Sequence, residues 1–231
     1  MVKTISKSKN KVAGIIIFFA LATFPFGQLL NVDLGFLSAK LHLLDVLIGF
    51  GFGWFLLTNK IKKFKVFIPF FLVLLFSYLL SLLMFGANET LSGGLYLIRL
   101  VSYFGFATLV SDFAKTKEFK RKLIASLVLV SSAAAIFGWV QYFLFVNFAP
   151  FLEFGWDDHL FRLAGTFLDP NFLGIILVLG FLGAAKFYKE ERSKLWLLAS
   201  VFLVFSLLFT YSRSSYLALA AGSFFLFLKD N

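Results

Sequence analysis

The sequence is organised around residues 161–174, which read FRLAGTFLDPNFLG. This is the most polar and turn-rich interval of a chain that is otherwise almost continuously apolar. Asp169 is a good N-cap and Pro170 a good first helical residue, so we predict that a helix begins there. The N–H groups at a helix N-terminus and the guanidinium of the nearby Arg162 both suit an anion. We interpret the stretch as one wall of an anion site at a membrane surface. The simpler alternative is a capped helix beside an arginine that reaches toward water.

Composition places the chain in a membrane. Hydrophobic residues make up 60% of the sequence, Phe alone supplies 35 of 231 residues, and charged residues make up only 15%. Several apolar runs approach the roughly 20 residues that cross a bilayer as a helix. The net charge of +10 comes from short lysine clusters between these runs, so it reflects membrane topology and does not indicate a nucleic-acid partner. The absence of cysteine excludes disulfides, thiolate metal sites and cysteine nucleophiles.

The apolar runs predict an all-α polytopic membrane protein with about eight transmembrane helices, forming a single domain over residues 1–231. The sixth and eighth runs are short for a full crossing. In the second run, Gly49 and Gly53 are four residues apart and share a helix face, which favours close packing against a neighbouring helix. The predicted spans are residues 12–30, 41–57, 66–85, 93–110, 123–145, 172–185, 195–211 and 215–228.

Basic residues alternate sharply between the connecting segments. Eighteen of the 22 lysines and arginines fall on one side of the predicted membrane. The positive-inside rule makes that side cytoplasmic and puts both termini inside. The longest segment on the other side, residues 146–171, mixes aromatic and acidic side chains, so we expect it to lie along the outer membrane interface.

Three arginines remain on the outer side or within a span: Arg99, Arg162 and Arg213. Each lies near the outer, N-terminal end of a helix that runs inward, and Arg99 is roughly 9 Å deep in span four. An arginine inside a membrane costs at least about 2.5 kcal/mol, so it needs a partner or a polar cavity. Either Arg99 forms an ion pair with Asp45, or the three arginines converge on a polyanion.

Smaller polar residues surround the predicted anion site. Asp169 and Asn171 begin one helix, while Ser212, Ser214 and Ser215 are interpreted as hydroxyls that cap the start of span eight. No spacing matches a known nucleotide-binding or hydrolase motif, so no catalytic residue and no cofactor is assigned. Asp157-Asp158-His159 is not expected to bind a metal, because three adjacent side chains do not converge easily.

Three stretches resemble the O-antigen ligase and polymerase superfamily of bacterial envelopes. The resemblance covers roughly residues 90–228, and earlier spans fit it only in topology. It rests on the order and placement of three motifs. The first is residues 162–167, which lead into Pro170-Asn171 at a helix start. The others are Thr210-Tyr211-Ser212-Arg213-Ser214-Ser215 between two spans and Tyr96-Leu97-Ile98-Arg99-Leu100 in span four.

The resemblance implies a multi-pass protein of the bacterial cytoplasmic membrane that transfers a glycan from undecaprenyl diphosphate at the outer face. Family arginines hold the diphosphate, and Arg99, Arg162 and Arg213 match them. Fixed positive charge in a water-poor site would stabilise such a leaving group. The acceptor is lipid A-core in ligases or another carrier-linked glycan in polymerases, and the sequence does not select between them.

The chain also departs from the family pattern. Family members usually have further spans and a large outer loop that carries a histidine, and neither His42 nor His159 lies at that place. The chain is therefore either the N-terminal part of a longer or split protein or a degenerate relative of the family. We expect the former, able to bind carrier lipid, with its catalytic base unassigned. Two other functions stay open: a transporter or flippase for an anionic or lipid-linked substrate, and a noncatalytic scaffold of envelope assembly.

Overall fold

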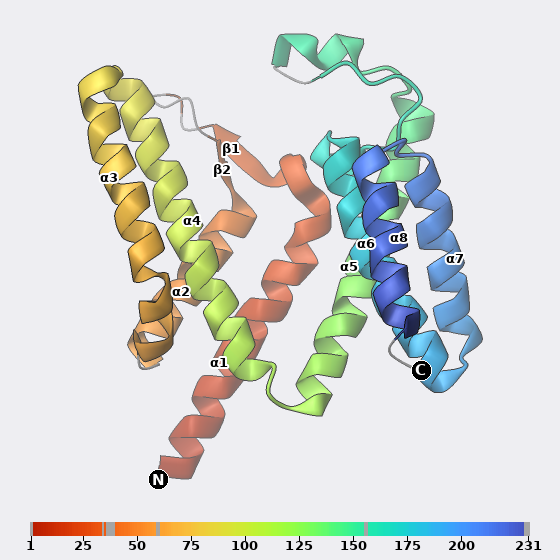
Figure 1. Ribbon diagram of the computed structural model, residues 1–231, viewed down its shortest axis with the longest axis horizontal. Helices are drawn as coiled ribbons and strands as arrows, with labels where there is room; N and C mark the ends of the chain where they lie inside the picture. Colours follow the sequence, from red (N-terminus) through yellow and green to blue (C-terminus); the bar gives the residue numbers. More distant parts are fainter. Residues whose placement is uncertain (1, 34, 36–39, 59–60, 155–156, 229–231) are drawn as a thin grey trace. The chain divides into compact units, whose positions relative to one another are not determined.

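The computed structural model describes the chain except for residues 1, 34, 36–39, 59–60, 155–156 and 229–231. The described residues are almost entirely helical (Figure 1), which confirms the prediction of an all-α chain. Each predicted span corresponds to one α-helix. The helices are α1 (Val2–Thr23), α2 (Leu43–Thr58), α3 (Ile68–Met84), α4 (Ala87–Phe113), α5 (Lys117–Leu144), α6 (Pro170–Glu191), α7 (Lys194–Leu208) and α8 (Arg213–Leu228).

Within the described residues, five helical segments are long and apolar enough to cross a membrane: residues 11–30, 64–84, 87–113, 117–144 and 170–191. The helices α2 and α7 are apolar but shorter. Helix α6 extends six residues beyond the predicted span, to Glu191, because lysine and glutamate are good helix formers even outside an apolar run. It ends at Arg192, whose φ of 55° is left-handed. The number of crossings and the orientation stay predictions.

The chain forms two compact units, which are described separately. Unit 1 contains residues 1–23 and 30–119, and unit 2 contains residues 24–29 and 120–231. The 3₁₀ helix η1 (Phe24–Leu30) belongs almost entirely to unit 2, where the rings of Phe24 and Phe26 pack against Phe167 and Phe137.

Unit 1 is built around α2, which packs against α1 and α4. A short hairpin of β1 (Asn31–Asp33) and β2 (Lys40–His42) precedes α2, and the 3₁₀ helix η2 (Ile61–Phe67) leads into α3. The predicted close packing through Gly49 and Gly53 is wrong, because no described atom lies within 4 Å of a Cβ built on either residue. The close approach is at Gly51, where a Cβ would overlap the ring of Phe106 of α4. Two residues correspond to about 200° of rotation, so Gly51 lies on the opposite face of α2.

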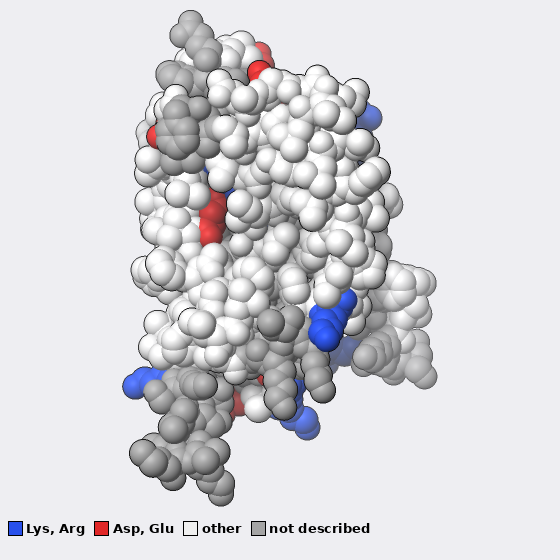
Figure 2. All heavy atoms as spheres, turned by 90° about the vertical axis from the view of Figure 1, so that its left-hand side faces the viewer, with Lys and Arg blue, Asp and Glu red and all other residues white. Residues whose placement is uncertain are grey.

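Helix α3 packs against α4 on one side and leaves most of its apolar surface exposed. None of its residues is buried, and Leu83 is 85% exposed. Figure 2 shows this face of the molecule as a broad, almost uncharged surface. Water would disfavour an apolar surface of this size, whereas hydrocarbon chains would not. The structure is therefore that of a membrane-embedded helical protein.

Unit 2 is organised around α6, which packs against α7 and α8 (Figure 1) and against α5. Small residues allow these close approaches: a Cβ at Gly180 would overlap Ser131 of α5, and one at Gly174 would overlap Ser215 of α8. Leu173, Leu177 and Leu203 are fully buried in the resulting core. At the far end of α6, Arg121 of α5 pairs with Glu191, whose other carboxylate oxygen accepts from Trp196 Nε1 at 3.1 Å.

In the segment predicted to lie at the outer interface, residues 146–171, one buried aromatic residue makes several of the contacts. Phe148 is buried, its ring contacts those of Phe151 and His159, and its N–H donates to the His159 carbonyl at 3.1 Å. The 3₁₀ helix η3 (Ala149–Phe154) follows, and an isolated bridge joins Asn147 to Leu160. Leu152, Leu160 and Phe161 remain exposed. The described residues of this segment thus combine backbone hydrogen bonds with an apolar surface, as an interfacial position requires, and that position stays a prediction.

Candidate anion site at the N-terminal ends of α6 and α8

The segment that carries Arg162 is held by a glutamine of α5. Gln141 is 9% exposed, and its side-chain oxygen accepts from the N–H groups of Ala164 at 2.9 Å and Gly165 at 3.0 Å. Its side-chain nitrogen donates to the Phe145 carbonyl at 3.0 Å and, more weakly, to the Arg162 carbonyl at 3.4 Å. Gly165 has a φ of +62°, which a residue with a Cβ rarely adopts. The turn at 162–165 is therefore fixed by one buried amide and one glycine.

Arg162 is fastened to the turn between α7 and α8. Its Nε donates to the Thr210 carbonyl at 2.9 Å and its Nη2 to the Tyr211 carbonyl at 3.4 Å. The neighbouring Leu163 N–H donates to the Phe209 carbonyl at 2.8 Å. These acceptors are neutral, so they orient the guanidinium without neutralising its charge. Among the residues that the structure describes, none accepts a hydrogen bond from Nη1 and no carboxylate pairs with Arg162.

Hydroxyl groups cap the start of α8, as the sequence predicts. Ser212 Oγ accepts from the Ser215 N–H at 3.3 Å and from Ser215 Oγ at 2.8 Å, and it lies 3.1 Å from Ser214 Oγ. The Ser212 N–H in turn donates to Thr210 Oγ1 at 3.3 Å. Ser215 Oγ is also 3.4 Å from the carbonyl of Asn171 in the first turn of α6. The N-terminal ends of α6 and α8 therefore adjoin.

Asp169 is the N-cap of α6 and Pro170 its first residue, so the predicted helix start is confirmed. Asp169 Oδ1 accepts from the N–H groups of Asn171 at 2.7 Å and Phe172 at 3.3 Å. The N–H groups on which the anion-site interpretation relied are thus already occupied by the protein's own carboxylate. At this end of unit 2 the arginines are the groups that can bind an anion.

Arg213 is the first residue of α8 and its side chain is exposed. It forms no ion pair or hydrogen bond with a described residue. It follows Tyr211 by two residues, and the carbonyl of Tyr211 is bound by Arg162. The structure therefore brings Arg162, Arg213, Ser212, Ser214 and Asn171 to one end of unit 2.

Arg99 lies in unit 1 and has a different environment. Its Nη2 is 2.7 Å from Asp45 Oδ2 and also donates to the Lys40 carbonyl at 2.7 Å. The Asp45 side chain is only 7% exposed, against 25% for Arg99. Its other oxygen accepts from the Tyr103 hydroxyl at 2.6 Å, and the His42 N–H donates to Oδ2 at 3.1 Å. The ion-pair alternative for Arg99 is therefore the arrangement observed. The convergence of all three arginines on one polyanion stays a prediction.

Two residues that organise the site did not stand out in the sequence analysis. Gln141 fixes the Arg162 turn, and the buried Thr210 supplies an acceptor for Arg162 and another for Ser212. A glutamine inside a predicted membrane span was a usable signal, because polar residues in such spans are costly and are usually retained for a purpose. Thr210 gave no comparable signal, since its backbone carbonyl carries the contact to Arg162.

Comparison of the chain with protein-family models, curated proteins and solved structures gives no match.

Proposed function

We propose that this chain binds the diphosphate of an undecaprenyl-diphosphate-linked glycan at the outer face of the bacterial cytoplasmic membrane, as the donor-binding part of an O-antigen ligase or polymerase. The observation that carries the proposal is Arg162. It is oriented by two backbone carbonyls, retains its full charge, and lies beside the turn that leads into Arg213.

The chemistry of a diphosphate fits this end of unit 2. A diphosphate carries several negative oxygens, and a guanidinium can present two parallel N–H groups to such a group. No described residue accepts a hydrogen bond from Nη1 of Arg162, so this group can donate to a ligand. The exposed Arg213 supplies a second cation. Ser214 and the side chain of Asn171 are exposed beside them and add neutral donors. Binding here requires neither a metal nor a catalytic base on this chain.

The charge pattern along the chain supports the orientation. The lysine clusters follow α2, α4 and α6, whereas Arg162 and Arg213 precede α6 and begin α8. With the clusters in the cytoplasm and all eight helices crossing, the arginine end of unit 2 faces outward. That is the side on which carrier-linked glycans are used in the family that the sequence resembles.

Arg213→Ala gives the sharpest test, because that side chain is exposed and supports no described contact. Purified protein in nanodiscs would be titrated with undecaprenyl diphosphate, and binding followed by native mass spectrometry. A hydrogen bond to a charged group contributes about 1.5–3 kcal/mol, so we expect affinity to fall roughly tenfold or more. Arg162→Lys keeps the charge and loses the planar fork, and we expect a similar loss.

The matched control is Arg121→Ala, which removes an exposed guanidinium from the first turns of α5, beside the far end of α6. It should leave diphosphate binding unchanged. Equal losses in Arg121→Ala and Arg213→Ala would mean that general basicity holds the lipid. Undiminished binding in both Arg213→Ala and Arg162→Lys would refute the proposal and favour a scaffold.

A further inference from the structure

An apolar groove runs between α6 and α7, with a volume of about 790 Å³. Its walls are aliphatic and aromatic side chains, among them Phe181 and Ala185 of α6 and Val201, Val204 and Leu208 of α7. Ser200 also lines it, but its hydroxyl already donates to the Trp196 carbonyl at 2.8 Å. The groove therefore offers its occupant an almost entirely apolar interior.

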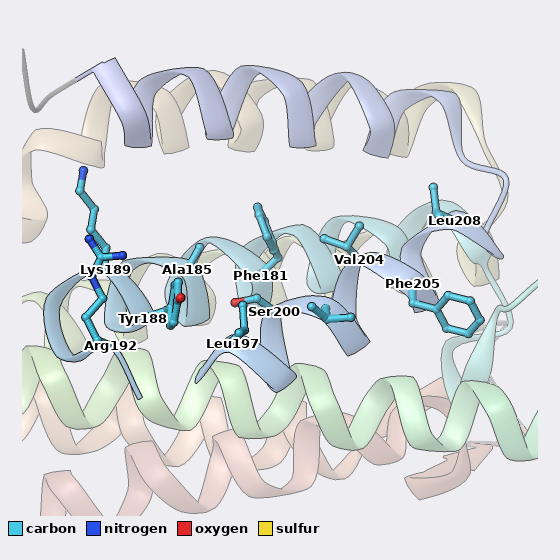
Figure 3. A pocket seen from close by; sticks show the side chains of 11 residues that line it. Phe181, Ala185, Tyr188, Lys189, Arg192, Leu197, Ser200, Val204, Phe205 and Leu208 are labelled. Carbon is cyan, nitrogen blue, oxygen red and sulfur yellow. The ribbon is translucent and has the colours of Figure 1, made fainter. Parts of the chain in front are cut away.

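The two ends of the groove differ in charge. Figure 3 shows Lys189 and Arg192 together at one end, beside Tyr188, and Phe205 and Leu208 at the other. The Arg192 guanidinium lies over the Tyr188 ring, 5.7 Å from its centroid. No carboxylate of the described residues pairs with Arg192. The groove is thus a long apolar surface that ends at a cationic pair.

The length of the groove matches one leaflet of a bilayer. Its lining on α7 extends from Leu197 to Leu208, which is roughly 16 Å at 1.5 Å per residue. The hydrocarbon core of a bilayer is about 30 Å thick, so half of it is about 15 Å. The groove is also open sideways, since Val201 is 60% and Phe205 50% exposed. An acyl chain could therefore enter it from the surrounding lipid without a change in the fold.

We propose that this groove binds an anionic phospholipid, with one acyl chain along α6 and α7 and its phosphate at Lys189 and Arg192. The two cations favour an anionic headgroup. The apolar part of the groove is about as long as an ordinary acyl chain, which it therefore fits better than the much longer undecaprenyl chain. Basic pockets between membrane helices on the cytoplasmic side suit such headgroups. The cationic end of the groove is at the C-terminal end of α6, whereas the diphosphate site is at its N-terminal end, so the two sites would hold their phosphates at opposite ends of this helix.

The test compares phosphatidylglycerol with phosphatidylcholine of identical acyl chains. Each lipid is titrated into the detergent-solubilised protein, and bound lipid is counted by native mass spectrometry. Near a membrane surface each cation contributes about 1 kcal/mol toward an anionic lipid, which corresponds to roughly fivefold in affinity. We expect the double variant Lys189→Gln/Arg192→Gln to lose most of the preference for phosphatidylglycerol. The control Lys117→Gln/Lys120→Gln removes two exposed lysines near the start of α5 and should retain that preference.

The acyl-chain part of the proposal has its own variant. Val204→Trp fills the groove and should reduce binding of phosphatidylglycerol at least fivefold. Leu195→Trp places the same ring at a 66% exposed position of α7, on the face turned away from the groove, and should change little. Circular dichroism checks that both variants keep their helices. Equal binding of the two lipids, or unchanged binding in Val204→Trp, would overturn the proposal. Either result would leave the Arg213 experiment unaffected, because it probes a different ligand at the other end of α6.

Discussion

Arg99 in unit 1 and Arg162 in unit 2 are the same residue type at similar positions in the sequence pattern, yet their partners differ. Arg99 meets a nearly buried carboxylate, Asp45, that also accepts from Tyr103 and His42. Among the described residues, Arg162 donates only to backbone carbonyls. The first cation is paired with a carboxylate within the fold, whereas the second is paired with no described carboxylate, and we propose that it binds a ligand. Two arginines that look alike in the sequence can thus differ in whether the fold supplies a counter-ion.

The largest loss of stability is expected when the ion pair between Arg99 and Asp45 is broken. Asp45→Ala removes the counter-ion of Arg99, which keeps its hydrogen bond to the Lys40 carbonyl, and leaves the Tyr103 hydroxyl without its acceptor. Removing one partner of a buried pair costs about 3–5 kcal/mol, and we expect the lower end because Arg99 is 25% exposed. The measurement is thermal or denaturant unfolding in detergent.

A double variant separates the effect of an unpaired charge on stability from any effect of Arg99 on ligand binding. Asp45→Leu/Arg99→Leu removes both charges and should be more stable than Asp45→Ala, because no charge is left unpaired. Binding of undecaprenyl diphosphate should persist in it if the diphosphate site belongs to unit 2 alone. Loss of binding in a folded double variant would instead mean that Arg99 contributes to the site, so that the two arginines would not differ in role.

An intermediate effect is expected at Gln141. Gln141→Leu deprives the buried N–H groups of Ala164 and Gly165 of their acceptor, and each unsatisfied group costs about 1–3 kcal/mol. The variant should unfold about 2–3 kcal/mol more easily and should also weaken diphosphate binding, because the Arg162 turn loses its support. Asp45→Ala, by contrast, should affect stability alone.

Gln141→Glu is the matched control for that prediction. It keeps an acceptor for both N–H groups, but it replaces the donor to the Phe145 and Arg162 carbonyls by a carboxyl oxygen and adds an acidic group at a buried position. A smaller loss of binding than in Gln141→Leu is the expected result. If Gln141→Leu binds diphosphate normally, the orientation of Arg162 by this turn has no functional meaning.

The smallest effect is expected at Asp169, and its sign is opposite. Asp169→Asn retains a side-chain oxygen for the cap but removes a negative charge from the end of α6. Exposed charges interact by about 0.2–1 kcal/mol, so diphosphate affinity should rise roughly two- to fivefold while stability changes little. Titration of the two proteins side by side measures this. A decrease in affinity would mean that the carboxylate itself contacts the ligand or its counter-ion.

Much of the molecule could be predicted from local features of the chain. Apolar runs and lysine clusters indicated the eight helices, Asp169-Pro170 indicated the start of α6, and the serines around Arg213 indicated the cap of α8. These features depend on residues within a few positions of one another, and capping or hydropathy acts over that range. The end of α6 was missed because the helix continues through charged residues after the apolar run stops.

The sequence by itself therefore determined the helical, membrane-embedded character of the protein and the polar segments that interrupt it. Only the tertiary structure decided the partners of each arginine. Arg162 reaches Thr210 across 48 positions of the chain, and Gln141 reaches Gly165 across 24. Candidates for such contacts can be named from composition, as Asp45 was for Arg99. The choice among them depends on which helix faces meet, and that is set by close contacts such as those at Gly51 and Gly174.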